Sequence, residues 1–220
     1  MESWMSRSCY CCESPAVGQG DHVPPLALFA VGTFASSPPM IVPSCTAHNQ
    51  SKSSADEYLK YVLSSTAEFV PTTVREKTAR SIVRHLRRRD APLHRYGISQ
   101  TAAGLTTGRT APVNEELLED GLSKVARGVY YHFHGGAKKL VGELAVYPIF
   151  LGLIDNAPPP IYATFANICA LMENELSTSP LLGEHQDVFA FQVVDEPRFV
   201  MINIIFYRTK FVSVIKRLTD

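Results

Sequence analysis

The sequence predicts an α+β protein, in which a small metal-stapled module precedes several helices and a C-terminal antiparallel β-meander. Three observations support this prediction. The first 50 residues hold four cysteines and two histidines in short pairs. The middle of the 220-residue chain has apolar residues at helical spacing, and its end consists of runs rich in Val, Ile and Phe.

The central helices follow from this spacing. Residues 55–69 repeat apolar side chains at helical intervals, and Ser53 or Ser54 can cap the start. A second helix follows Pro71 and ends near Asp90, with apolar and basic residues on separate stripes. Residues 97–113, rich in Gly, Thr and Ala, show no period and are interpreted as a loop or linker.

The last hundred residues combine two helices and three strands. Asn114 can cap a helix that runs to about Tyr131, and residues 161–176 form another apolar helical pattern. Three β-rich runs then follow at 188–194, 199–207 and 211–216. We therefore expect a module at 1–70, a basic helix and linker at 71–113, and a mixed α+β domain at 114–220.

Charge and hydropathy exclude two protein classes. The formal net charge is zero, so the chain does not coat nucleic acid by bulk charge. Residues 59–104, however, carry nine basic and three acidic side chains, so a local anion-binding surface is expected there. The apolar stretches are shorter than the roughly 20 residues of a membrane helix. Five cysteines without a recognisable export signal predict reduced thiols and a cytoplasmic protein.

Two short pairs predict a structural zinc site. Cys9 and Cys12 form a C-x2-C pair, and Cys45 and His48 form a C-x2-H pair 33 residues after Cys12. Two such pairs can clamp one tetrahedral zinc ion and close the loop between them. Cys11 can replace Cys9 or Cys12 as a ligand, and the spacing leaves that choice open.

A recognisable order of motifs links the two pairs. The loop between them contains Asp-His-Val-Pro-Pro at 21–25, and Asn49 and Lys52 follow the second pair. This order resembles the HNH endonuclease superfamily, in its branch with a zinc-stapled, treble-clef-like ββα-metal module. The resemblance covers residues 9–60.

The resemblance implies a metal-dependent nuclease that hydrolyses DNA. His22 matches the histidine that activates water, while Asp21 and Asn49 match the positions that hold a catalytic Mg²⁺ or Mn²⁺. A neutral imidazole can take a proton from water, and carboxylate and amide oxygens suit a hard cation. The middle asparagine of the family has no counterpart in residues 38–44. The alternative is a degenerate, zinc-stapled module that binds nucleic acid or protein, as part of a defence or toxin system.

The remaining expectations concern partners. The basic helix is the candidate surface for the DNA backbone, with RNA left open. The residues expected to contact nucleic acid are Lys52, Arg80, Arg84, Arg87 and Arg88. Residues 114–220 show no catalytic set, and we expect them to mediate self-association or to bind a regulatory protein.

Overall fold

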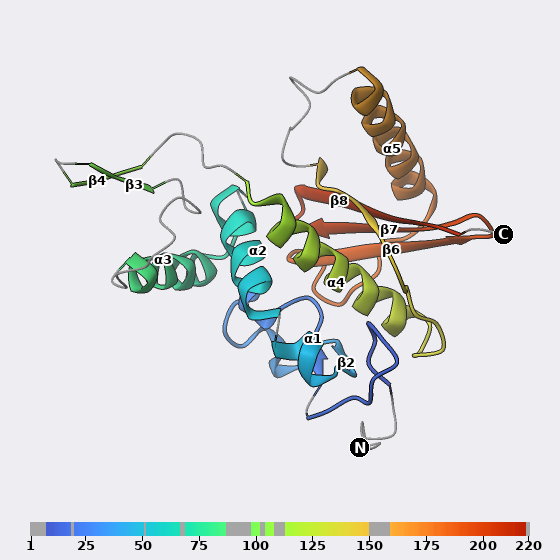
Figure 1. Cartoon of the computed structure of the whole chain (residues 1–220), viewed down its shortest axis with the longest axis horizontal. Coiled ribbons are helices and arrows are strands. Elements are labelled where there is room, and N and C mark those ends of the chain that lie inside the picture. The colour runs from blue at the N-terminus through green and yellow to red at the C-terminus, as the bar shows by residue number, and fades with distance from the viewer. Residues whose placement is uncertain are drawn as a thin grey trace.

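The protein is described here from a computed structural model, shown in Figure 1. The described residues are 8–18, 20–50, 52–66, 69–86, 98–101, 104–107, 113–149 and 159–218. The fold is a mixed α+β arrangement of helices and antiparallel sheets, which confirms the predicted class at that level.

A short hairpin opens the fold. Strands β1 (Asp21–His22) and β2 (Ile41–Val42) pair antiparallel, with His22 opposite Ile41. Two 3-10 helices, η2 (Leu26–Leu28) and η3 (Thr33–Ala35), lie between these strands. Gly20 leads into β1 with a φ of +81°, and a side chain there would collide with Ile41 and with the backbone of β2. Glycine at this position therefore allows β2 to lie close to the start of β1.

Three helices follow the hairpin. They are α1 (Thr46–Gln50), α2 (Lys52–Thr66) and α3 (Thr72–Leu86). The apolar residues of α2 face inward, and Leu59 and Leu63 are fully buried. A hairpin of β3 (Ile98–Thr101) and β4 (Gly104–Thr107) comes next, where the sequence predicts a loop. The prediction of a loop is wrong for these residues. The two strands are joined by hydrogen bonds between their backbones, and such bonds form without an alternating pattern of apolar side chains, so the sequence pattern did not reveal the strands.

The C-terminal half is built on a four-stranded antiparallel sheet with the order β5-β8-β7-β6. Its strands are β5 (Ala145–Tyr147), β6 (Phe189–Glu196), β7 (Phe199–Phe206) and β8 (Lys210–Arg217). The predicted three-stranded meander is confirmed, and β5 adds an edge strand beside β8. Strand β5 was not predicted, because it is too short to show an alternating pattern of apolar residues. It is defined by its pairing with β8, which lies far from it in the sequence.

Helix α4 (Glu115–Phe133) connects the two halves. Its predicted cap is confirmed, because the Asn114 side chain accepts a hydrogen bond from the backbone amide of Leu117 at 3.0 Å. Figure 1 shows α4 between the sheet and α2, and contacts with both are extensive. Helix α5 (Pro159–Thr178) completes the fold, and its Ile168 and Leu171 line a pocket together with sheet residues.

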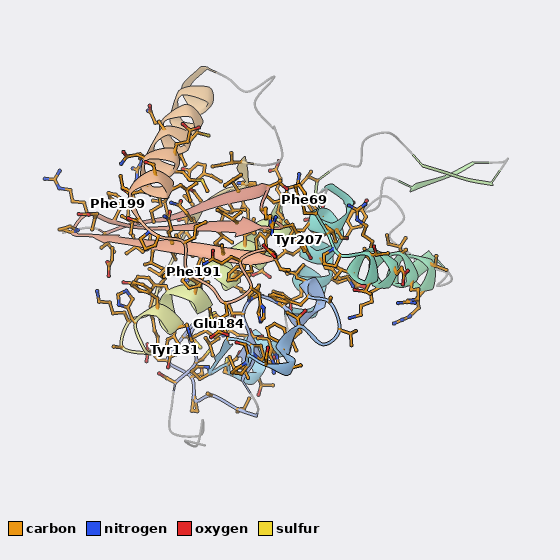
Figure 2. The ribbon with its side chains drawn as sticks, turned by 180° about the vertical axis from the view of Figure 1, so that it is seen from behind. Phe69, Tyr131, Glu184, Phe191, Phe199 and Tyr207 are labelled. Atoms are coloured by element: carbon orange, nitrogen blue, oxygen red, sulfur yellow. The ribbon has the colours of Figure 1, made fainter. Side chains whose placement is uncertain are left out.

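One hydrophobic core joins residues from the beginning and the end of the chain. Val23, Leu59, Leu122 and Ile202 all belong to it. The hydroxyl of Tyr207, at the end of the sheet that faces the N-terminal module in Figure 2, donates a buried hydrogen bond to the carbonyl of Leu28 at 2.7 Å. The division at residues 70 and 113 stays a prediction. Among the described helices, none is long and apolar enough to span a membrane.

Candidate metal centre and catalytic pocket

Four predicted ligands converge on one point. The ligand atoms of Cys9, Cys12, Cys45 and His48 all lie within 4.8 Å of one another. Nδ1 of His48 lies 3.6 Å from Sγ of Cys9, 3.5 Å from Sγ of Cys12 and 3.1 Å from Sγ of Cys45. In a tetrahedral zinc site the ligand atoms are about 3.5–3.8 Å apart. The cluster therefore has the ligand set of a Cys3His zinc site, and several of its ligand atoms already lie near the distances that a bound zinc ion imposes.

Local backbone geometry explains how each pair forms. The backbone amide of Cys11 donates to Sγ of Cys9 at 3.4 Å, which curls the first pair into a knuckle. Cys45 stands at the start of α1, so that His48 lies one helical turn later on the same side. The two pairs are joined by a hydrogen bond from the Tyr10 amide to the carbonyl of Pro43 at 2.8 Å.

The structure also decides which cysteines belong to the cluster. Of the three cysteines near the first knuckle, Cys9 and Cys12 contribute their thiols and Cys11 does not. Burial raises the pKa of the Cys11 thiol to about 12 and also raises the pKa of Cys9, so the positions of the sulfur atoms, and not their acidities, separate these two cysteines. The alternative that the sequence left open is thereby resolved in favour of Cys9 and Cys12.

A polar pocket of about 310 Å³ lies beside β1 and holds two of the predicted catalytic residues. Asp21 and His22 line it, together with Pro25, Leu26 and Ala27. The rest of the described lining comes from α2, which contributes Asp56, Glu57 and Lys60. Asp21 is largely buried, and the hydroxyl of Tyr10 donates to its Oδ2 at 3.0 Å.

The other predicted site residues lie elsewhere or outside the described residues. Asn49 is exposed on α1, directly after His48 of the Cys3His cluster, and is not among the described residues that line the pocket. Arg80 and Arg84 are exposed on α3. The side chain of Lys52 falls outside the described part of the chain, as do Arg87 and Arg88. The structure thus brings Asp21 and His22 together but does not place Asn49 at the same pocket.

Sequence reasoning missed the α2 wall of this pocket. Asp56 and Lys60 are four residues apart, so they share one face of the helix, and Glu57 is adjacent to them. This spacing was visible in the sequence as a polar face of a helix. Its position opposite His22 was not visible, because that depends on how α2 packs against η2 and β1.

Helix α4 packs against the hairpin that carries His22. Gly128 of α4 packs against Val23, the residue after His22, and Val23 is only 2% exposed. A Cβ atom at Gly128 would lie 2.5 Å from Cγ2 of Val23. The absence of a side chain at position 128 therefore lets the helix approach the hairpin closely.

A second cavity, of about 480 Å³, lies behind the hairpin, between it and the sheet. Its walls are mostly aromatic and aliphatic, and they include Phe29, Phe34 and Phe191, with Glu184 and His185 as polar members. Figure 2 labels Phe191 and Glu184 near this junction. Although larger, the cavity holds neither Asp21 nor His22, so the polar pocket is the better candidate for hydrolytic chemistry.

No protein-family model, curated protein or solved structure matches this chain.

Proposed function

We propose that this protein is a metal-dependent endonuclease of the HNH type that hydrolyses phosphodiester bonds in DNA. The observation that carries the proposal is the polar pocket lined by Asp21 and His22, which Tyr10 connects to the Cys3His cluster. In this reading the zinc is structural and does not contact the substrate.

The charge of the pocket supports a divalent cation there. Among the described residues, three carboxylates line the pocket, from Asp21, Asp56 and Glu57, together with one ammonium group, that of Lys60. A phosphodiester would be repelled by such a net negative lining unless a cation neutralised it. Carboxylate oxygens are the preferred ligands of Mg²⁺ and Mn²⁺. We assign Asp21 as a protein ligand of this ion, whereas Asn49, the second ligand expected from the sequence, is exposed on α1 and is not among the described residues that line the pocket.

The chemistry assigned to the chain is hydrolysis by activated water. An imidazole nitrogen of His22 accepts a proton from water as its oxygen attacks phosphorus. The bond from phosphorus to the 3′ oxygen breaks, and the departing oxygen takes a proton from solvent. Tyr10 orients the Asp21 carboxylate through its hydroxyl. When bound, the divalent ion supplies stabilisation of the negative charge that develops on the phosphate.

The experiment is cleavage of supercoiled plasmid with and without Mg²⁺ or Mn²⁺. We expect metal-dependent nicking or linearisation that His22→Ala lowers by at least about 100-fold. His132→Ala is the matched control, because His132 is exposed on α4 and is not part of the pocket lining. Zinc content and circular dichroism must be equal in the three proteins. Equal cleavage by His22→Ala and the parent would refute the assignment.

A second candidate is a zinc-stapled binding module without catalysis. Two observations favour it, namely the missing middle asparagine in residues 38–44 and the position of Asn49 away from the pocket lining. This candidate predicts that the folded, zinc-loaded protein binds DNA or a protein partner without metal-dependent turnover. The plasmid assay therefore separates the two candidates directly.

A further inference from the structure

Lys60 is the one cation among the described residues that line the catalytic pocket. It lies on α2, one helical turn after Asp56, and lines the same pocket as Asp21 and His22 of β1. The side chain is partly buried. A lysine in such a position keeps its stem against the protein and presents its ammonium group to the pocket.

Helix α3 packs beside this wall and brings two more cations close to Lys60. The hydroxyl of Ser81 donates a hydrogen bond to the carboxylate of Glu57, which joins α3 to α2 next to Lys60. Lys77 and Arg84 lie four residues before and three residues after Ser81, so all three share one face of α3.

The pKa of Lys60 reflects how close it lies to charged groups of α2 and α3. Burial lowers the pKa of Lys60, and Glu57 raises it. Arg84 and Lys77 lower the pKa of Lys60 further, because their positive charges repel its ammonium group. Both α3 cations therefore lie close enough to Lys60 to interact with it electrostatically. Lys77 and Arg84 thus lie on the face of α3 that contacts α2 next to Glu57 and Lys60.

The pocket lining and the neighbouring face of α3 therefore carry opposite charges. Asp21, Asp56 and Glu57 are the carboxylates that line the pocket, while Lys60 of its wall and Lys77 and Arg84 of the adjoining face of α3 form a cationic row. Mutual repulsion within such a row is relieved by an anion. Seven residues of helix, from Lys77 to Arg84, rise about 10 Å, and the phosphates of one DNA strand follow each other every 3.4 Å or so along the duplex axis. The row is long enough to meet more than one phosphate.

We propose that Lys60 binds the scissile phosphate in the catalytic pocket, and that Lys77 and Arg84 bind neighbouring phosphates of the same strand along α3. This inference rests on the proposed nuclease function. Lys60 donates a hydrogen bond from Nζ to a non-bridging oxygen and offsets the charge that grows there as water attacks. Lys77 and Arg84 contribute affinity and position the strand without touching the reacting atoms.

The alternative is that Lys60 only forms an ion pair with Glu57 that stabilises the packing of α2. That role would make Lys60 matter for stability and leave the cleavage rate of bound DNA unchanged. The two roles are therefore separated by measuring cleavage at saturating DNA, binding and thermal stability on the same variants.

The experiment uses the full chain, a fluorescent DNA duplex and the variants Lys60→Gln, Lys60→Arg, Lys77→Gln and Arg84→Gln. Arg75→Gln is the matched control, because Arg75 lies nine residues before Arg84, about two and a half helical turns away and thus on the opposite side of α3. Cleavage is measured under single-turnover conditions with Mn²⁺. Binding is measured by fluorescence anisotropy in Ca²⁺ over a range of salt concentrations.

We expect Lys60→Gln to lower the cleavage rate of saturated enzyme by about 100-fold, as removal of one transition-state donor does in other enzymes. Lys60→Arg should restore most of that rate. Lys77→Gln and Arg84→Gln should each weaken binding and reduce the slope of log affinity against log salt by about 0.9, while their rates at saturation stay at the parental value. Arg75→Gln should match the parent in both assays.

Several outcomes overturn the inference. Parental cleavage by a folded Lys60→Gln protein removes the catalytic role of Lys60 and leaves the nuclease function intact. If both Lys77→Gln and Arg84→Gln keep the affinity and the salt slope of the parent, the proposed role of Lys77 and Arg84 in binding phosphates is refuted. If Lys60→Gln melts below the assay temperature, Lys60→Met, which keeps an apolar stem, takes its place. Absence of cleavage by the parent itself refutes the proposed function and the catalytic role of Lys60 with it, while the binding assay still decides the row.

Discussion

The hydroxyl of Tyr10 donates a buried hydrogen bond to the carboxylate of Asp21 at 3.0 Å. Tyr10 is part of the first cysteine knuckle, between Cys9 and Cys11, whereas Asp21 lines the polar pocket proposed to be catalytic. Burial raises the pKa of Tyr10, so its hydroxyl stays protonated and remains a donor. This bond is the direct physical connection between the metal centre and the proposed catalytic residues.

Tyr10→Phe should weaken both the fold and the site. It removes one hydrogen bond to a charged group, and such bonds contribute about 1.5–3 kcal/mol. We expect a fall of that order in the free energy of unfolding, measured with urea, and a higher Mn²⁺ concentration for half-maximal activity, because Asp21 is less well oriented to bind the ion. Tyr147→Phe on strand β5 is the control. Unchanged unfolding and metal dependence in Tyr10→Phe would show that this bond does not position Asp21.

Cys45→Ser should lose zinc, whereas Cys11→Ser should keep it. Cys45 contributes its thiol to the cluster, and Cys11 lies outside it although it is adjacent to Cys12. Zinc per chain, measured by atomic emission on the purified proteins, is expected to drop from one to near zero only in Cys45→Ser. The metal-free protein should also unfold in its first 60 residues, because binding energy of this kind is folding energy. The assignment of ligands fails if Cys11→Ser is the variant that loses zinc.

Gly128→Ala should destabilise the protein and lower activity. The new methyl group would lie 2.5 Å from Cγ2 of Val23, which forces α4 away from the hairpin that carries His22. Overpacking of this kind costs about 1–3 kcal/mol. Gly121→Ala is the matched control on the same helix, because its nearest neighbour, the carbonyl oxygen of Ala55, is 3.4 Å away. Thermal melts of both variants test the contrast, and a Gly128→Ala protein as stable as Gly121→Ala would contradict it.

Asp195 should make stability depend on acid pH. Its Oδ2 accepts hydrogen bonds from Lys138 at 2.6 Å and from Tyr130 at 3.2 Å, and the bond from Lys138 is the main cause that holds the pKa of Asp195 below its ordinary value. A carboxyl group with a lowered pKa stabilises the folded state above its ordinary pKa. That contribution is lost as the pH falls through the folded pKa, which here means below about pH 4.

The measurement is the difference in melting temperature between the parent and Asp195→Asn from pH 7 to pH 2.5. We expect the parent to be more stable at pH 7, to keep that advantage down to about pH 4 and to lose it below. His134, whose pKa is lowered by burial, also faces Asp195 and adds attraction once it is protonated. Loss of zinc in acid affects both proteins, so it cancels in the difference. A pH-independent difference would exclude the ionised carboxylate as its source.

Local patterns in the sequence anticipated several features correctly. The candidate ligands follow from spacing, apart from the choice among Cys9, Cys11 and Cys12, because two residues three positions apart present their side chains to one point in a knuckle or in a helical turn. The cap at Asn114 and the three strands of the meander were also visible, since a capping side chain and an apolar run act over a few residues. These features depend on near neighbours in the chain.

Other features escaped prediction because they join distant residues. Strand β5 is recognisable only by its pairing with β8, and the β3–β4 hairpin lacks an alternating pattern. Lys60 reads in the sequence as a charge on an exposed helix face. It becomes part of a pocket with His22 only because α2 packs beside the hairpin.

The sequence by itself therefore determined which atoms can bind zinc and which histidine is the candidate base, because spacing and residue chemistry are local properties. The tertiary structure alone decided that Cys11 stays outside the cluster, that Tyr10 joins the metal centre to Asp21, and that a helical wall with Lys60 faces His22. The physical reason is that burial and side-chain contact arise from the packing of segments separated along the chain, and no local pattern specifies that packing.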